Sequence, residues 1–388
     1  MVHLLLVAIY LAYISLGLPD SLLGAAWPAM YPQLVVPISY AGILSVIISC
    51  STVLSSLLSG RIIARLGTGR VTAFSVLLTA GALLAFSVGN SFWVLCFLAI
   101  PYGLGAGCVD TALNNYVAIH YESRHMSWLH CMWGLGASAG PYIMGQMLAA
   151  SKGWPSGYRA IGFIQLALAF VVFISLPLWD KKEPTTVEHH DASKLSFLAC
   201  LRLPGAVQMI LCFFFYCALE QTMGLWAGSY LTLSKGMTQD AAARFTALFF
   251  AGITVGRALS GFATLRIKEK HLISGGFGII ALGVAVLLLP LPPVLTLAGL
   301  LIVGFGCAPI YPCLIHLTPH YFSPQASATL MGLQIASAYL GSFSMPSLFG
   351  FFANQWGTQL FPVFLFAMLV LVGWMYAWLL KLVSAKPQ

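Results

Sequence analysis

The stretch LLLVAIYLAYISLGLPDSLLGAAWPAM, residues 4–30, contains one residue that is charged at neutral pH, Asp20. As an α-helix this run would be roughly 40 Å long, which exceeds the ~30 Å hydrocarbon core of a bilayer. Backbone N–H and C=O groups find no water in hydrocarbon, so a segment that crosses it must be a helix or belong to a closed barrel. The run therefore predicts a transmembrane helix that carries an acidic residue within the membrane.

The rest of the chain repeats this pattern. Of its 388 residues, 60% are hydrophobic and only 7% are charged, and the mean hydropathy is +0.91. Such a composition is typical of integral membrane proteins. Polar, glycine and proline breaks divide the chain into twelve spans, at residues 4–31, 38–65, 70–89, 92–121, 126–150, 157–179, 204–233, 239–265, 272–290, 293–321, 326–353 and 358–382. We therefore expect an all-α membrane protein with twelve transmembrane helices, which works as a monomer in a lipid bilayer.

The longest polar interval, DKKEPTTVEHHDASK at residues 180–194, lies at the midpoint of the chain. It separates the sixth predicted span from the seventh, and a tract this polar is expected to be solvated. The predicted organisation is an N-terminal six-helix bundle (residues 1–179), a cytoplasmic linker (180–199) and a C-terminal six-helix bundle (200–388).

The two halves of the sequence are weakly similar to each other. A shift of 201 residues places LSG (58–60) on LSG (259–261), and the same shift places GLG (103–105) on GFG (304–306). Shifts of 205 and 200 match Gly136, Pro141 and Gly145 with Gly341, Pro346 and Gly350, and Asp20 and Gly24 with Glu220 and Gly224. Repeated spacing in four helix pairs predicts two pseudo-symmetric six-helix bundles, an arrangement typical of transporters that alternate access to a central site.

The basic residues predict the orientation in the membrane. If the N-terminus is cytoplasmic, most of the 18 Lys and Arg residues fall in cytoplasmic segments, and only Lys152, Arg159, Lys235 and Arg244 lie outside. Short loops rich in Lys and Arg stay on the cytoplasmic side, so both termini are expected there. The net charge of +8 then reports orientation and does not imply binding to nucleic acid. The expected location is a bacterial plasma (inner) membrane.

Three of the ten acidic residues, Asp20, Asp110 and Glu220, lie deep within predicted spans. An ionised carboxylate that faces lipid costs at least about 2.5 kcal/mol, so each should face an aqueous cavity or a partner. The alternative is a buried acid satisfied by a neighbouring Arg, His or hydroxyl group. A carboxyl group in a partly dehydrated cavity can exchange a proton, so these three are the candidates for proton coupling.

Helical spacing gathers further polar and aromatic residues near these acids. Trp27 lies seven residues after Asp20, and Asn114 lies one turn after Asp110, so each pair shares a helix face. The predicted substrate-binding residues are Asp20, Trp27, Asn114, His130, Trp133, Glu220, Trp226, Tyr311 and Gln334. Carboxylates, amides and aromatic rings around one space suit a polyhydroxylated ligand. For any single aromatic residue, packing or anchoring at the membrane interface is the alternative.

Three segments resemble the major facilitator superfamily and, within it, the fucose–proton symporter group of sugar carriers. LPDSLLGAAWPAM is similar to that group's first helix, which implies that Asp20 binds sugar. GCVDTALNNYV is similar to its fourth helix, which implies proton coupling by Asp110 and a polar contact from Asn114. LHCMWGLGASAGP is similar to its fifth helix, which implies that His130 and Trp133 face the sugar.

A fourth segment, SGRIIARLGTGRV, resembles the superfamily's loop G-x-L-A-D-R-x-G-R-R between its second and third helices. The resemblance implies gating roles for Gly60, Arg61, Arg65 and Arg70. The segment departs from the pattern because Ala64 replaces the usual Asp and Gly69 replaces a basic residue.

Two further departures concern charges within the membrane. Asp110 stands where the sugar carriers have Glu, and Glu220 has no counterpart in their pattern. Arg257 could pair with Glu220 or serve a gate at the cytoplasmic end. The gate is favoured, because by residue count Arg257 lies roughly 10 Å nearer the cytoplasm than Glu220.

The function expected from these observations is proton-coupled symport of a small polar solute, most simply a sugar or sugar derivative. The alternative is a proton-coupled exporter of drugs or metabolites, because GASAGPYIMG (136–145) partly resembles an antiporter signature, G-x-x-x-G-P-x-x-G-G. Close helix packing through small residues explains the same segment equally well. An enzyme is not expected: His316 and His320 lack a further metal ligand in the sequence pattern, and no cofactor or metal is implied.

Overall fold

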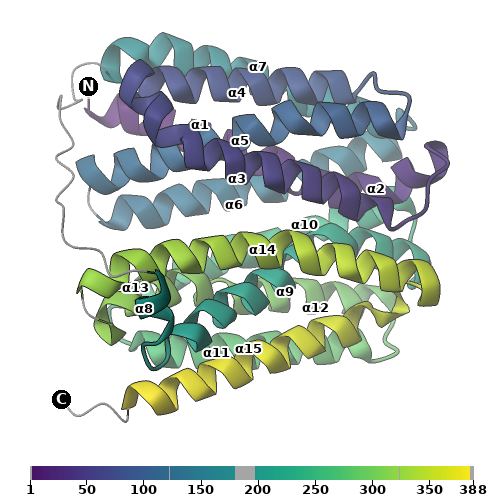
Figure 1. The fold of residues 1–388 in the computed structure, drawn as a ribbon. Coiled ribbons are helices and arrows are strands. Elements are labelled where there is room, and N and C mark those ends of the chain that lie inside the picture. Colours follow the sequence, from purple (N-terminus) through teal and green to yellow (C-terminus); the bar gives the residue numbers. More distant parts are fainter. Residues whose placement is uncertain (1, 122, 180–196, 323, 385–388) are drawn as a thin grey trace.

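The computed structural model describes residues 2–121, 123–179, 197–322 and 324–384 (Figure 1). The first half contains α1 (Val2–Asp20), α2 (Leu22–Gln33), α3 (Tyr40–Leu66), α4 (Thr68–Phe86), α5 (Phe92–His120), α6 (Ser123–Ala149) and α7 (Gly153–Trp179). The second half contains α8 (Phe197–Leu201), α9 (Ala206–Leu233), α10 (Gln239–Ala263), α11 (Glu269–Leu288), α12 (Pro293–Cys307), α13 (Ile310–Tyr321), α14 (Pro324–Trp356), the 3-10 turn η1 (Thr358–Leu360) and α15 (Phe361–Ser384).

The predicted all-α membrane architecture is confirmed. Within the described residues, eleven helical segments are long and apolar enough to cross a membrane, and the 27-residue helix α6 lies among them as a twelfth. The first and tenth predicted spans are each interrupted, the first between α1 and α2 and the tenth between α12 and α13. Figure 1 shows α1 to α7 on one side and α9 to α15 on the other, with both chain ends at the same end of the molecule.

The predicted linker at 180–199 falls mostly outside the described residues, which resume at residue 197. The division of the chain at that interval therefore stays a prediction.

The contacts of matched glycines confirm the pseudo-symmetry of the halves. A methyl group at Gly136 would collide with the carbonyl oxygen of Ile14, and one at Gly341 would collide with that of Phe214. The partners Ile14 and Phe214 are themselves 200 residues apart. Gly103 and Gly304 repeat the relation on another helix pair, against the carbonyl oxygens of Ile48 and Phe249. Helices pack this closely only where the side chain is absent, so the repeated glycines fix the same helix crossings in each half.

Two prolines within the helices of the first half leave carbonyl oxygens that accept hydrogen bonds from side chains of other segments. Pro19 has no N–H, so it leaves the carbonyl oxygen of Ser15 without its helical donor, and Gln165 of α7 donates an amide N–H to that oxygen. Pro141 likewise frees the carbonyl oxygen of Ala137, which accepts a 2.6 Å hydrogen bond from Ser21. Within a membrane such carbonyls need a protein partner, and these partners stabilise the interruption that follows Asp20.

Contacts between the halves extend from the end of the molecule opposite the chain termini to the middle, where Gly134 faces Thr254 and Trp133 faces Arg257. Gly24 and Gly224, which are partners in the repeat, meet at the interface between the two halves, here called the seam. A methyl group on Gly24 would collide there with the carbonyl oxygen of Gly224. Nearby, Gln239 donates a 3.0 Å hydrogen bond to the carbonyl oxygen of Pro28. Asp20 is exposed although it lies near the middle of the first span, so open space reaches the centre of the seam. The molecule is therefore closed at the end that faces away from its termini.

Candidate substrate-binding and proton-coupling site

Asp110 on α5 lies in a compact polar cluster of the first half. The hydroxyl group of Tyr13 on α1 donates to Asp110 Oδ1 at 2.7 Å, and the amide of Asn114 donates to the same oxygen at 2.9 Å. Asn114 also donates to the Tyr13 hydroxyl oxygen at 2.6 Å. The ring of His130 on α6 meets the Tyr13 ring edge to face, with 5.6 Å between the ring centres. Asp110, Asn114 and His130 thus lie close together, with Tyr13 between them, and their roles in coupling and substrate binding stay predictions.

Asp20 lies at the edge of the first half, beside the seam. It is the last residue of α1, and its Oδ2 accepts a 2.7 Å hydrogen bond from the indole N–H of Trp133 on α6. The side chain is otherwise exposed. Asp20 therefore keeps a carboxylate oxygen available to a ligand while Trp133 holds its orientation.

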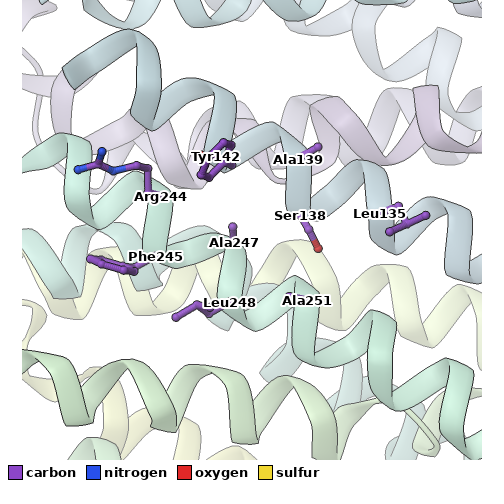
Figure 2. A pocket seen from close by; sticks show the side chains of 9 residues that line it. All are labelled: Leu135, Ser138, Ala139, Tyr142, Arg244, Phe245, Ala247, Leu248 and Ala251. Atoms are coloured by element: carbon purple, nitrogen blue, oxygen red, sulfur yellow. The ribbon is translucent and has the colours of Figure 1, made fainter. Parts of the chain in front are cut away.

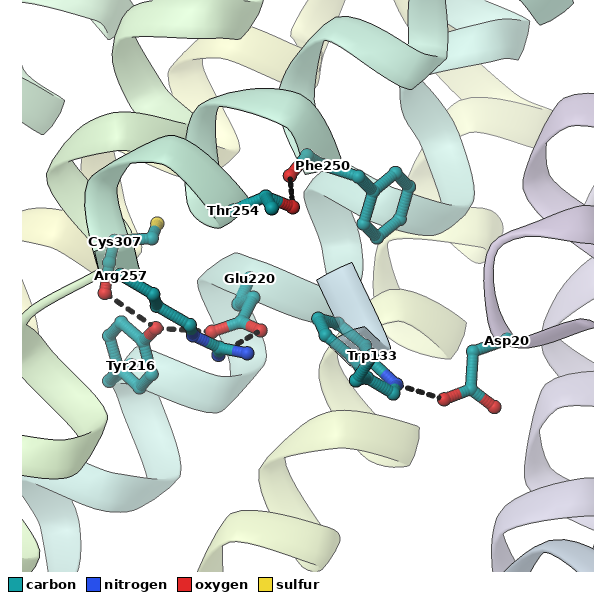
Figure 3. A network of polar contacts seen from close by, with 8 residues as sticks. All are labelled: Asp20, Trp133, Tyr216, Glu220, Phe250, Thr254, Arg257 and Cys307. Atoms are coloured by element: carbon teal, nitrogen blue, oxygen red, sulfur yellow. Dashed lines mark hydrogen bonds and ion pairs between the residues drawn. The ribbon is translucent and has the colours of Figure 1, made fainter. Parts of the chain in front are cut away.

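The chain of contacts continues from Trp133 into the second half (Figure 3). The guanidinium carbon of Arg257 on α10 lies 5.1 Å from the centre of the Trp133 ring, a cation–π contact across the seam. Arg257 Nη2 lies 3.8 Å from Glu220 Oε1 on α9. Asp20, Trp133, Arg257 and Glu220 thus form one network that spans both halves.

Glu220 is also held from its own helix. The hydroxyl group of Tyr216, one turn earlier on α9, contacts Glu220 Oε2 and lies 2.9 Å from the carbonyl oxygen of Cys307. Cys307 ends α12, and Pro309 follows at the break before α13. The interrupted helix therefore presents the carbonyl oxygen of Cys307 to Tyr216, as interrupted helices present carbonyl oxygens in membrane transporters.

The remaining predicted binding residues lie outside this network. The indole N–H groups of Trp27 and Trp226 each donate at 2.8 Å to a backbone carbonyl, of Ile38 and Pro346 respectively, and both side chains are fully buried. Gln334 is buried and bonded to Thr318. Tyr311 packs on Phe213 and Tyr216 of α9, at the border of the network. In this conformation Trp27, Trp226 and Gln334 serve packing, so their substrate contacts stay predictions.

The residues predicted for gating lie in the last turns of α3 and the first turn of α4. Gly60, Arg61, Arg65 and Arg70 are exposed there. Gly67 alone separates the helices, with φ of 80°, a value that favours glycine. Gly69 faces the ring of Trp179 at a distance that leaves no room for a side chain, which explains why the basic residue of the family pattern is absent. The gating roles of these residues stay predictions.

Arg257 pairs with Glu220 in the structure, which is one of the two roles that the sequence left open. The role of Arg257 in a gate at the cytoplasmic end, which the sequence favoured, stays a prediction. By residue count, the backbone of Arg257 lies nearer the cytoplasm than that of Glu220. An arginine side chain is long enough to bridge that separation.

Two tyrosines were missing from the prediction: Tyr13, which bonds to Asp110, and Tyr216, which contacts Glu220. Tyr13 lies seven residues before Asp20 and Tyr216 four residues before Glu220, so each shares a helix face with an acid. The same spacing rule that selected Trp27 could have identified both.

A carboxylate does lie against the histidine pair, which the sequence pattern had not supplied. Glu269 of α11 contacts His316 of α13 at 2.5 Å, and the rings of His316 and His320 lie 5.3 Å apart. In the part of the chain that the structure describes, no group of three metal-ligating side chains gathers.

Two hollows among the described residues are not lined by Asp20, Asp110 or Glu220. One is a largely apolar groove of about 500 Å³ between α6 and α10, with Tyr142 and Arg244 at one end (Figure 2). The other, of about 530 Å³, lies at the closed end between Tyr31, Ser234 and Asn354. The polar network at the seam is therefore the better candidate for a transport site.

Comparisons with known proteins agree with this geometry. The sequence profile of the Major Facilitator Superfamily matches residues 9–343 and 209–388. Bypass of stop codon protein 6 of Saccharomyces cerevisiae is 24% identical over 96% of this chain and 81% of its own length. The glucose/mannose transporter GlcP of Bacillus subtilis is 24% identical over 77% of this chain and 76% of its own. A bacterial homologue of the human lysosomal transporter Spinster, solved in an inward-facing and occupied conformation, has a TM-score of 0.71 at 13% identity and covers 98% of this chain and 97% of its own.

Proposed function

The chain belongs to the Major Facilitator Superfamily, and on that premise we propose that it is a secondary transporter that carries a sugar or sugar derivative together with protons. The observation that carries the proposal is the contact between Asp20 and Trp133 at the centre of the seam. A carboxylate beside an indole ring is a common way to bind a sugar, because the carboxylate accepts from hydroxyl groups and the ring stacks on the apolar sugar face. The name of the similar Bacillus subtilis protein and the resemblance of three helices to fucose–proton symporters support the same substrate class.

Asp110 is the proposed proton carrier. Its Oδ1 accepts from both Tyr13 and Asn114, and two donors stabilise the charged form that remains after the proton leaves. Burial in the membrane favours the neutral form when the cavity closes and water is excluded. Exclusion of water would favour protonated Asp110, and the two hydrogen-bond donors would favour the ionised form when water returns. Asp110 could thus bind a proton on one side of the membrane and release it on the other.

Alternating access is the proposed mechanism. If the protein lies in a bacterial inner membrane with its termini on the cytoplasmic side, the closed end faces outward. The described conformation is then inward-facing. Solute and proton would enter while the opposite end is open, and the loaded neutral site would permit closure of the halves. Release into the cytoplasm then follows from the conformation described here.

The exporter alternative rested on residues 136–145. Two of its glycines, Gly136 and Gly140, pack against the carbonyl oxygens of Ile14 and Leu18 in α1. This packing accounts for the small residues without an antiporter role, so the symporter is the function that we carry forward.

The test is uptake of labelled glucose, mannose, galactose and fucose by proteoliposomes, with and without an inward proton gradient. We expect gradient-driven uptake, with a roughly tenfold loss in Asp110→Asn, since coupling free energies of 1–3 kcal/mol are typical. Sugar exchange without a gradient should survive in this variant, because asparagine keeps a polar side chain of the same size. Expulsion of cationic dyes without movement of any sugar would reject the symporter.

The matched control is Asp240→Asn. Asp240 is also acidic, but it lies in the first turn of α10, far from the network, and its partner is Arg244 of the same helix, at 2.7 Å. Its uptake should equal that of the unaltered chain.

A further inference from the structure

Arg257 is a nearly buried cation with few partners among the described residues. Its side chain is 13% exposed, and the ion pair that it forms there with Glu220 has a separation of 3.8 Å. That separation exceeds the 2.7–3.2 Å of an N–H···O hydrogen bond. A guanidinium group has five N–H donors, and the further contact of this one is the face of the Trp133 ring. A cation within a membrane protein normally has closer partners, so the site is suited to a second anion.

Glu220 depends less on this pair than Arg257 does. Its other carboxylate oxygen is in contact with the hydroxyl group of Tyr216, and the side chain is 11% exposed. If Glu220 binds a proton, its carboxyl group keeps the Tyr216 hydroxyl as a partner and Arg257 loses its anion. The pair can therefore open without leaving the acid isolated.

A ligand at Arg257 would also reach the rest of the network. The guanidinium lies over Trp133, whose N–H holds Asp20, and Figure 3 shows the three side chains in sequence between the halves. An anionic group on Arg257 would therefore leave the remainder of the solute beside the Trp133 ring and the exposed carboxylate of Asp20.

We infer that the solute carries a carboxylate that binds Arg257 in place of Glu220, so that the transported class is sugar acids. The inference rests on the proposed function and names the substrate class of the same site. Arginine binds carboxylates through two parallel N–H···O bonds, which a neutral hydroxyl group cannot accept equally well. The long pair with Glu220 is the resting arrangement, in which the protein's own carboxylate occupies the place of the substrate's.

The exchange requires one proton for each anion. A proton from the outer solution binds a carboxylate oxygen of Glu220, and the freed guanidinium binds the carboxylate of the solute. On the inner side the solute leaves with its negative charge, the Glu220 proton returns to water, and the ion pair forms again. Proton and anion cross together, so this step moves no net charge.

The titratable groups that face Glu220 come from four helices. They are Tyr216 and Cys217 of α9, Arg257 of α10, Cys307 of α12 and Tyr311 of α13. Arg257 in turn faces His130 and Cys131 of α6. Thiols and phenols are ordinarily neutral near pH 7, so the charge that opposes Glu220 comes from Arg257.

The experiment is calorimetric binding to the purified full chain in detergent, with three pairs of probes: glucose and glucuronate, galactose and galacturonate, and mannose and mannuronate. Each pair differs only at C6. For the matching ring, we expect the acid to bind about tenfold more tightly than the neutral sugar, the usual scale of a charge-assisted hydrogen bond.

Variants distinguish the site from the fold. Glu220→Gln should bind the acid more tightly, because the competing carboxylate is gone. Glu220→Gln with Arg257→Gln removes both charges together, which avoids an unpaired buried charge, and should lose the preference for the acid. Arg244→Gln is the control, because that arginine pairs with Asp240 at the closed end, and it should leave the preference unchanged.

Each outcome decides between the two proposals. Binding of a neutral sugar that equals or exceeds that of its acid, unchanged in the double variant, would overturn the sugar-acid inference and leave the proposed sugar transporter standing. Absence of binding by all six probes would reject both.

Discussion

At the scale of single residues, Trp133 is the side chain that joins the two halves of the candidate site. Its indole N–H donates to Asp20 of the first half, and its ring face receives Arg257 of the second. One side chain thus contacts a charged group of each half. Trp226 makes a hydrogen bond of similar length, but to the backbone carbonyl of Pro346 within the packed second half.

This contrast gives a prediction for Trp133→Phe. Phenylalanine keeps an aromatic ring but removes the N–H, so Asp20 loses its oriented partner. We expect substrate binding to weaken about tenfold, the scale of a hydrogen bond to a charged group, while the melting temperature in detergent stays near that of the unaltered chain.

Trp226→Phe should behave in the opposite way. It leaves the buried carbonyl oxygen of Pro346 without its indole donor and should cost about 1–3 kcal/mol of stability, with the affinity of the surviving folded protein unchanged. Equal effects of the two substitutions on binding and on melting would show that Trp133 has only a packing role.

Glycine contacts and interrupted helices organise the molecule at the scale of elements. The same crossing, α1 with α6 and α9 with α14, depends in each half on a glycine against a carbonyl oxygen. Breaks after Asp20 and after Cys307 place polar groups in the middle of the membrane. In a regular helix the carbonyl oxygen of Cys307 would accept a backbone N–H of its own helix. The break leaves it available to Tyr216 of the network.

Gly341→Ala tests the packing of the elements. The added methyl group would collide with the carbonyl oxygen of Phe214, and overpacking of this kind costs about 1–3 kcal/mol. We expect a lower melting temperature in detergent, measured by the loss of the monodisperse peak after heating. Gly136→Ala, its partner in the repeat, should have the same effect.

Gly261→Ala is the control for this measurement. A methyl group at Gly261 meets nothing within 4 Å, and alanine is favoured over glycine in a helix by roughly 0.5–1 kcal/mol. Its melting temperature should equal or exceed that of the unaltered chain, and a loss as large as that of Gly341→Ala would contradict the packing argument.

At the scale of the whole molecule, closure at one end is the feature that alternating access must reverse. Gln239 of α10 donates across the seam to the carbonyl oxygen of Pro28, which Pro32 leaves without its helical N–H donor. Ser347 of α14 similarly approaches the carbonyl oxygen of Gly42, at 3.3 Å. These bonds stabilise the closed end and have to break when that end opens.

Gln239→Ala should therefore shift the population toward opening at that end. Loss of one neutral hydrogen bond is worth about 1 kcal/mol, or roughly a fivefold change in the equilibrium. The measurement is the rate at which an impermeant maleimide labels Ser347→Cys from the side opposite the termini, in a chain whose exposed Cys50 is replaced by serine. We expect labelling to accelerate severalfold.

Gln359→Ala is the matched control, because that glutamine lies at the same end but bonds within its own segment, to the carbonyl oxygen of Trp356. Equal labelling rates in the Gln239 and Gln359 variants would mean that the hydrogen bond to Pro28 does not hold the closed end.

Hydropathy and spacing by themselves determined that the chain is an all-α membrane protein of two similar halves, and that Asp20, Asp110 and Glu220 are its unusual charges. Those properties are readable because a bilayer imposes the same requirement on every span, independently of which helices become neighbours. Only the tertiary structure decided that Arg257 meets Glu220, that Trp133 joins Asp20 to Arg257, and that Trp27 and Trp226 are buried in packing. Such contacts join residues more than a hundred positions apart, as with Asp20 and Trp133, and they depend on helix crossings and side-chain reach that one-dimensional periodicity does not contain.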